Sequence, residues 1–265
     1  MEPNKIIEGI TNYQDENQKW SLFYIENISD DFKKIVRKSL INICEGSDPI
    51  DNSYNNTVKE FIDRCDTSKR NEERKKGMIG ELLVHLIMGE FYDYSPASVL
   101  FNLEEKSFKK GYDLLMYSPT DKTLWITEVK SGEVPEKSEA NEKMAVLIKR
   151  ARDDLKERLN NSHKKGELWR NAYNHAKQAI DSPNERKAVL ELIKRENNKD
   201  RANSSDNNVL LASVLFFDLK DSTDSDLIKK SIKDEDEKLF NEIKLISIQE
   251  NTYDEMLAFL RSEIR

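Results

Sequence analysis

Two strand-like segments near the middle of the chain carry charged residues, and this combination most constrains the fold. Residues 112–117 and 124–129 are rich in Val, Ile, Trp, Tyr and Leu, the composition of buried β-strands. The turn-forming residues 118–122 join them, so we expect an antiparallel hairpin. A carboxylate buried in such a strand costs free energy unless a partner compensates its charge. The acids of this hairpin therefore predict a functional site.

Asp113, Glu128 and Lys130 are the charged residues that the hairpin brings together. Strand side chains two residues apart share a face, so Glu128 and Lys130 should lie side by side while Val129 points to the other face. Pairing of the strands should bring Asp113 close to Glu128. Mg²⁺ prefers carboxylate and carbonyl oxygens as ligands. We therefore predict a magnesium site formed by Asp113, Glu128 and the Val129 carbonyl, with the Lys130 cation beside it.

A further acid, Glu81, lies in a long helix expected over residues 68–92. The second half of this helix is apolar nearly all round, which indicates burial. Gly77 and Gly80 precede Glu81, and glycine costs about 1 kcal/mol relative to alanine inside a helix. Both glycines therefore predict that another backbone approaches closely. We expect Glu81 to complete the metal shell, the alternative being an ion pair with a buried basic residue. His85, one turn later, fits a core position better than a site position.

The order of the remaining elements predicts the fold class. We expect strands at 99–106, 112–117, 124–130, 209–219 and 243–248, and helices at 138–160, 166–181, 184–196 and 253–264. This order is typical of an α/β or α+β fold in which helices flank a central mixed sheet. Before it, a strand at 20–26 and helices at 31–44 and 55–65 should form an N-terminal accessory region over residues 1–66. The main domain then covers residues 67–265.

Composition limits the classes of protein that the chain can belong to. Hydrophobic residues make up 37% and charged residues 35%, and no apolar run approaches the roughly 20 residues that span a bilayer. The N-terminus lacks the pattern of a signal peptide, and Cys44 and Cys65 have no metal-binding spacing, so we expect a cytoplasmic protein. The net charge of −7 argues against binding nucleic acid over the whole surface, and leaves room for a local basic groove or a partner protein.

The site residues resemble the PD-(D/E)XK nuclease superfamily. Glu81, the segment 111–113 and the segment 128–130 resemble its helix acid, its second-strand aspartate and its E-x-K motif, and the element order over 69–219 matches its core. The resemblance implies that Asp113 and Glu128 bind Mg²⁺, which Mn²⁺ can replace, and that Lys130 acts on the attacking water. Tyr112 stands where the strict motif has proline.

A narrower resemblance, over residues 80–86, 109–113 and 125–132, is to the HamA nuclease subunit of Hachiman antiphage systems. In these systems the nuclease works with a superfamily 2 DNA helicase, which senses invading or damaged DNA and controls cutting. The resemblance implies a Mg²⁺-dependent DNA endonuclease or nickase with little sequence specificity, acting as the effector subunit of a defence complex. A helicase that supplies much of the DNA affinity would make the acidic net charge intelligible.

Several polar residues near the site are candidates for DNA binding. A basic cluster directly precedes the site aspartate, and we expect it to contact DNA: Lys106, Lys109 and Lys110. Ser131 either bonds to a phosphate or only ends its strand. Relatives in the superfamily often carry a glutamine or lysine on the helix after the E-x-K motif. Lys177 or Gln178 matches that position here, although an ordinary amphipathic helix explains them equally well.

Two other functions stay open. E-x-K patterns also occur on solvated strand faces, where the two side chains only pair with each other. The chain would then be a non-catalytic scaffold or nucleic-acid-binding subunit that keeps the nuclease fold and holds its acids in internal ion pairs. The other possibility is a restriction-type endonuclease that recognises a target sequence of its own.

Overall fold

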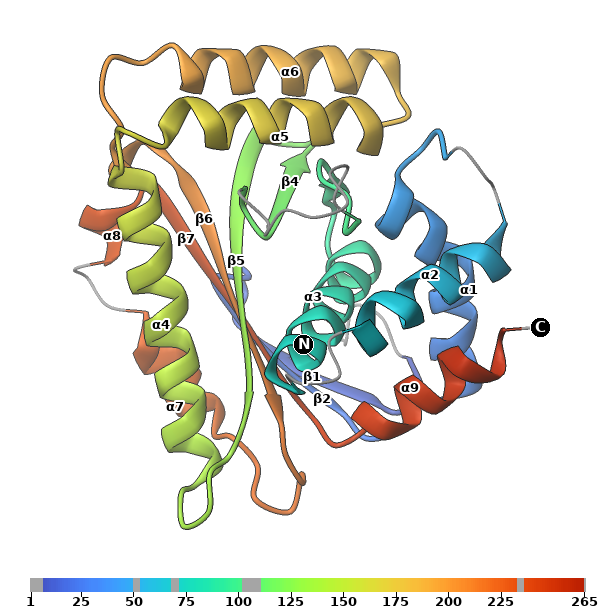
Figure 1. Cartoon of the computed structure of the whole chain (residues 1–265). Helices are drawn as coiled ribbons and strands as arrows, with labels where there is room; N and C mark the ends of the chain where they lie inside the picture. The colour runs from blue at the N-terminus through green and yellow to red at the C-terminus, as the bar shows by residue number, and fades with distance from the viewer. Residues whose placement is uncertain (1–6, 50–52, 68–71, 102–110, 233–235, 265) are drawn as a thin grey trace.

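A seven-stranded mixed sheet forms the centre of the molecule (Figure 1). The computed structural model describes residues 7–49, 53–67, 72–101, 111–232 and 236–264. The strand order is β1-β2-β7-β6-β5-β4-β3, with β2, β7, β6 and β5 parallel to one another and the outer strands antiparallel. The strands are β1 (Ile10–Gln14), β2 (Trp20–Ile25), β3 (Ser95–Pro96), β4 (Leu114–Ser118), β5 (Thr123–Glu133), β6 (Asn208–Phe216) and β7 (Glu242–Glu250).

Helices cover both faces of this sheet, which confirms the predicted fold class. One face packs against α1 (Asp30–Glu45), α2 (Tyr54–Thr67), α3 (Glu72–Phe91) and α9 (Tyr253–Ser262). The other packs against α4 (Ala140–Asn160), α5 (Lys165–Ala179), α6 (Pro183–Asn197) and α7 (Ser225–Ser231). The short helices η1 (Ser204–Asp206) and α8 (Asp236–Leu239) flank the start of β6 and of β7. No helix in the described ranges combines the length and the apolar character needed to cross a membrane.

The hairpin of β4 and β5 has the predicted antiparallel pairing. Leu114 lies opposite Thr127 and Ser118 opposite Thr123, so the turn is at residues 119–122. Side chains then alternate between the two faces: Val129 belongs to the apolar cluster around α3, whereas Ile126 belongs to the cluster around α4. Glu128 and Lys130 share the face of Ile126 and point toward α4. From β5 the chain passes through α4, α5 and α6 before it returns as the parallel strand β6.

The structure corrects the strand predicted at 99–106. The strand next to β4 is the two-residue β3, and residues 99–101 are not a strand; residues 102–110 lie outside the described ranges. The backbone N–H groups of Leu100 and Phe101 donate instead to the carbonyls of Ile43 and Cys44 at the end of α1. The last carbonyls of a helix have no partner within that helix. Residues 99–101 therefore cap the end of α1 and do not extend the sheet.

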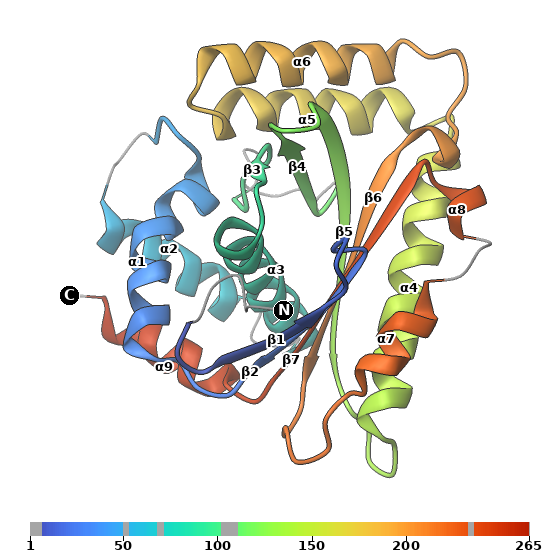
Figure 2. The same ribbon diagram turned by 180° about the vertical axis from the view of Figure 1, so that it is seen from behind.

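The segment before residue 67 shares the sheet and the apolar core with the rest of the molecule. Figure 2 shows β1 and β2 lying along one edge, where β2 pairs in parallel with β7. Buried side chains of α1 and α2 belong to the same cluster as those of α3. Strand β1 was not predicted from the sequence, because it lies at the sheet edge, is rich in polar residues and buries none of its five residues fully. Helix α7, in the charged segment between β6 and β7, buries Ile228.

Of the two glycines that precede Glu81 in α3, one marks a close approach, as predicted. A Cβ added to Gly80 would lie 2.0 Å from the Ser131 Oγ atom of β5 and 3.1 Å from its Cβ atom, so a larger residue would force the serine side chain to shift. The prediction was wrong for Gly77, where an added Cβ would meet no described residue within 4 Å.

Candidate active site

Glu128 is the centre of the candidate site. It lies in the middle of β5 and its side chain is 0% exposed. Three charged N–H groups donate to its carboxylate. Lys130 Nζ lies 2.7 Å from Oε1, and Arg158 reaches Oε2 at 2.7 Å and Oε1 at 3.1 Å through its two terminal nitrogens. The guanidinium therefore holds the carboxylate in a two-pronged contact, the strongest geometry for such a pair.

Lys130 connects this buried acid with a second one near the surface. Its Nζ atom lies 2.8 Å from Asp154 Oδ2 of α4, and the Asp154 side chain is 48% exposed. Burial acts to lower the pKa of Lys130, but the carboxylates of Glu128, Asp154 and Asp113 outweigh it and raise the pKa above its ordinary value. Lys130 is therefore a cation at neutral pH and a hydrogen-bond donor in this state of the site.

Asp113 lies directly before β4, where the register continues to place it opposite Glu128. Its Oδ2 atom accepts a hydrogen bond from the Val129 backbone N–H at 2.9 Å. In a strand, the N–H and C=O groups of one residue point to the same edge, so the Val129 carbonyl faces the edge on which Asp113 lies. The role of the Val129 carbonyl as a metal ligand stays a prediction. The hydrogen bond from the Val129 N–H group to Asp113 was not predicted.

The two acids influence each other. Burial raises the pKa of Glu128 to about 7, and the nearby charge of Asp113 adds to this, while Arg158 and Lys130 act to lower it. The cations around the carboxylate therefore offset part of the cost of burying its charge. A metal ion at this position would have to replace one of them.

Sequence reasoning missed Arg158 and Asp154. Both lie on α4, four residues apart, which places them on one side of the helix. Leu155 and Leu159, which flank Arg158, are buried against the sheet. A basic residue within the buried stripe of the helix that follows an E-x-K strand was the available signal. The Arg158 side chain is 27% exposed and also donates to the Gly111 carbonyl at 3.3 Å.

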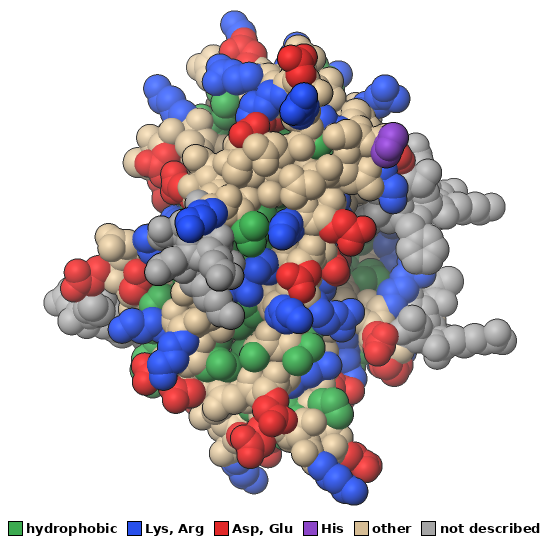
Figure 3. Space-filling model, turned by 90° about the vertical axis from the view of Figure 1, so that its left-hand side faces the viewer, with side chains coloured by type: hydrophobic (Ala, Val, Ile, Leu, Met, Phe, Trp, Pro, Cys, Tyr) green, Lys and Arg blue, Asp and Glu red, His purple; other side chains and the backbone are tan. Residues whose placement is uncertain are grey.

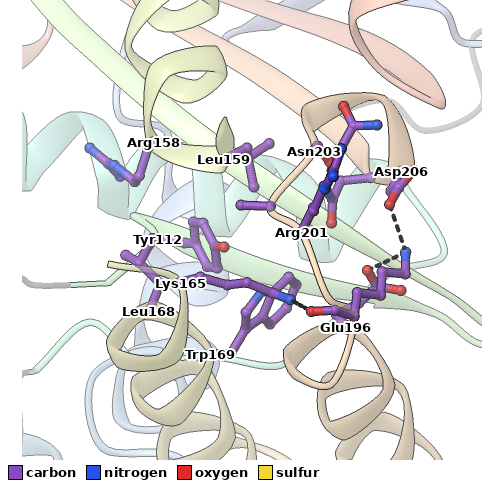
Figure 4. A pocket seen from close by; sticks show the side chains of 13 residues that line it. Tyr112, Arg158, Leu159, Lys165, Leu168, Trp169, Glu196, Arg201, Asn203 and Asp206 are labelled. Atoms are coloured by element: carbon purple, nitrogen blue, oxygen red, sulfur yellow. Dashed lines mark hydrogen bonds and ion pairs between the residues drawn. The ribbon is translucent and has the colours of Figure 1, made fainter. Parts of the chain in front are cut away.

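Two cavities meet at Arg158. The first is lined by residues of α4, α5 and the segment before β6. Figure 4 shows Arg158 at one end of this cavity, with its side chain pointing away from the charged groups at the opposite end. There Lys199 pairs with Glu196 at 2.6 Å and with Asp206 at 3.4 Å, and Tyr112 meets Trp169 edge-on. The second cavity is more open and is lined by the following residues: Gly111, Asp154, Glu157, Arg158, Asn161, Lys164, Glu167 and Leu168. Solvent therefore reaches the site beside Asp154.

Ser131 lies outside this group, and Glu81 belongs to α3 rather than to the hairpin. Both are on the α3 side of β5, because α3 packs against the face that carries Val129, and Ser131 Oγ faces Gly80. Glu81 is half-buried on α3, and the interactions of its carboxylate with a metal stay a prediction. His85 is buried on the same helix.

The other predicted DNA contacts lie elsewhere or outside the described residues. Gln178 Nε2 donates to the Glu45 carbonyl at 2.7 Å, so it joins α5 to the end of α1. Lys177 lies over the ring of Tyr173. The cluster that precedes Asp113 falls in the range that the structure does not describe: Lys106, Lys109 and Lys110.

The donor chemistry fits a magnesium ion. Within the described ranges, no group of three Asp, Glu, His or Cys side chains lies close enough to hold a metal ion unaided. Mg²⁺ needs less than that, because it keeps several water ligands and binds proteins through one or two carboxylates together with substrate phosphates. Asp113 and Glu128 supply two carboxylates, and the cations around Glu128 show that this position already accepts positive charge.

Comparison with known proteins assigns the chain to a family. The HamA family matches residues 3–264, which is nearly the whole chain and includes every residue of the site described above. A search of the curated proteins found no match. The E-x-K strand, the hairpin aspartate and the helix-flanked mixed sheet agree with this family assignment. The chain belongs to the HamA family, the nuclease-like subunit of Hachiman antiphage defence.

Proposed function

We propose that the chain is a metal-dependent DNA nuclease that cuts phosphodiester bonds with little sequence specificity. One observation carries the proposal: Asp113, Glu128 and Lys130 converge on one face of β5 beside a cavity open to solvent. Structural ion pairs are usually exposed, whereas this one buries a carboxylate completely and surrounds it with cations. Such an arrangement costs stability and is retained most readily where chemistry needs it.

In this reaction each side chain has a distinct role. Asp113 and Glu128 would hold Mg²⁺, which would supply charge neutralisation for the phosphate and make the attacking water more acidic. Lys130 stays protonated beside Glu128 and donates a hydrogen bond to the phosphate or to that water. Asp154 keeps the Lys130 ammonium directed toward the open side of the site. Mn²⁺ should replace Mg²⁺ because both are bound by oxygen ligands.

A partner protein is part of the proposal. Figure 3 shows the side of the molecule that carries α4, where Lys and Arg side chains alternate with Asp and Glu and form no large area of one sign. With a net charge of −7, long-range attraction of DNA by the chain alone should be weak. The family assignment supports a superfamily 2 helicase as the subunit that supplies DNA affinity and controls cutting.

One observation favours a second candidate, a non-catalytic scaffold. Both oxygens of Glu128 are already bound by Arg158 and Lys130, which is the internal pairing expected of an acid without a metal. In a scaffold, the pairs would persist in the presence of Mg²⁺ and no cleavage would follow.

Plasmid cleavage separates these possibilities. Supercoiled plasmid is incubated with Mg²⁺ and the chain, alone and together with its helicase partner and ATP. We expect nicked and then smeared DNA, loss of activity in EDTA, and a loss of at least about 100-fold for Lys130→Ala. Lys149→Ala is the matched control, since Lys149 is exposed on α4 and should change the rate little. Equal rates for Lys130→Ala and the parent would refute the proposal, and discrete bands would indicate a restriction-type enzyme.

A further inference from the structure

Arg158 is the residue of the site to which neither the family resemblance nor the strand pattern assigns a role. Its guanidinium binds both oxygens of Glu128, at 2.7 Å and 3.1 Å, and Lys130 binds Oε1 as well. Arg158 also donates to the Gly111 carbonyl, two residues before Asp113. One side chain of α4 therefore connects the E-x-K strand to the segment that carries the second acid.

The surroundings of Arg158 let its end group move. The flanking residues Leu155 and Leu159 anchor this turn of α4 in the core, at 0% and 5% exposed. The Arg158 side chain itself is 27% exposed and borders the open cavity on the side of Asp154. The guanidinium can therefore leave Glu128 for solvent or for the carboxylates at the cavity wall without disturbing the packing of the helix.

A metal ion and the Arg158 guanidinium would compete for the carboxylate of Glu128. Mg²⁺ binds carboxylate oxygens at about 2.0–2.1 Å, so an ion at Glu128 would lie within a few ångströms of the guanidinium. Two cations at that distance repel each other strongly in a buried position. The two-pronged contact also uses the lone pairs that face α4.

Accepting the proposed metal-dependent function, we propose that Arg158 is a positioning residue that competes with the metal for Glu128. In the metal-free protein it compensates the buried charge and fixes the orientation of the carboxylate. Metal binding displaces the guanidinium into the open cavity, and metal affinity is lower than the two carboxylates alone would give. A purely structural Arg158 differs in one respect: its removal would lower stability without strengthening metal binding.

Calorimetric titration of Mn²⁺ into the metal-free full-length chain tests this inference without relying on activity. Hydrogen bonds to charged groups that must be broken for binding correspond to at least about a tenfold change in Kd. We therefore expect Arg158→Gln to bind Mn²⁺ at least about tenfold more tightly than the parent, and Arg158→Lys to be intermediate. Arg150→Gln is the matched control, because it removes one exposed charge from the same helix without touching Glu128. It should stay within about twofold of the parent.

Each outcome decides the matter. An unchanged or weaker Mn²⁺ affinity of Arg158→Gln, in a parent that does bind Mn²⁺, would overturn the inference and leave the proposed function standing. Equal tightening by Arg150→Gln would also overturn it, since net charge would then be the cause. If Arg158→Gln does not fold, as judged by its thermal transition, Arg158→Lys alone must bind more tightly than the parent. Absence of Mn²⁺ binding in the parent and in every variant would defeat the metal-dependent function and the inference together.

Discussion

Glu128 and Glu250 are buried acids on opposite faces of the same sheet, and their surroundings differ sharply. Glu128 faces α4 and accepts hydrogen bonds from Arg158 and Lys130. Glu250 ends β7 on the α3 side, where its Oε2 atom accepts from the Thr252 N–H and hydroxyl groups. Its Oε1 atom is buried without a hydrogen-bond partner among the described residues. Both side chains are 0% exposed, and burial raises the pKa of each to about 7.

The comparison teaches that burial and a raised pKa do not by themselves identify a functional acid. Burial favours the neutral form of Glu250, because no cation among the described residues offsets its charge. Glu128 shares the raised pKa, but two cations contact it and one of them, Arg158, lines a cavity. A cation-rich environment marks the acid that can exchange one positive partner for another. We therefore propose that the α4 face carries the function and that the α3 face serves stability.

The largest expected difference is in catalysis. Glu128→Gln removes the charge that we propose to bind the metal, so it should lower the rate of plasmid nicking by at least about 100-fold. Glu250→Gln, on the other face, should leave the rate within about threefold. Both rates are measured at the same Mg²⁺ concentration with partner present. A similar loss of nicking rate in the two variants would contradict the functional difference between the α4 and α3 faces.

The next effect is the pH dependence of stability. Because the pKa of Glu250 rises from its ordinary 4.5 to about 7 on folding, the folded protein binds more protons between these values. The contribution of Glu250 to the free energy of unfolding is therefore complete below about pH 4.5 and is lost as the pH rises through 7. Between pH 5 and pH 8 the parent should lose on the order of 3 kcal/mol more unfolding free energy than Glu250→Gln. Denaturant titrations at the two pH values measure this, and parallel curves would show that Glu250 stays ionised.

Packing on the α3 face should be sensitive to a single methyl group. Gly80→Ala places a Cβ atom 2.0 Å from Ser131 Oγ and should cost about 1–3 kcal/mol of unfolding free energy. Gly77→Ala, one turn earlier in the same helix, meets no neighbour and should add up to about 1 kcal/mol. Urea unfolding compares the pair. A stable Gly80→Ala would mean that α3 is not held tightly against β5.

The smallest effect concerns the outer partner of Lys130. Asp154→Asn removes a half-exposed contact while Glu128 still holds the Lys130 ammonium, so the nicking rate should fall by less than about fivefold. The protein should remain as stable as the parent within about 1 kcal/mol. A loss as large as that of Glu128→Gln would place Asp154 within the essential site.

Local pattern in the sequence predicted the hairpin and the proximity of its charged residues. The period of two along β5 placed Glu128 and Lys130 on one face, and the turn at 119–122 determined the register that brings Asp113 near. Arg158 could not be placed in the same way, because three helices separate β5 from β6 and the packing of α4 decides which residue meets Glu128. The role of residues 99–101 could not be predicted from local sequence either, since the carbonyls of α1 that they bind are more than fifty residues away in the chain.

Calorimetric titration of Mn²⁺ into the parent, Glu128→Gln and Glu250→Gln examines the assignment of the α4 face most directly. We predict that the parent and Glu250→Gln bind Mn²⁺ with similar heats and affinities, and that Glu128→Gln loses binding by at least about tenfold. Binding of Mn²⁺ by Glu128→Gln with the affinity of the parent, or no binding by the parent at all, would contradict it.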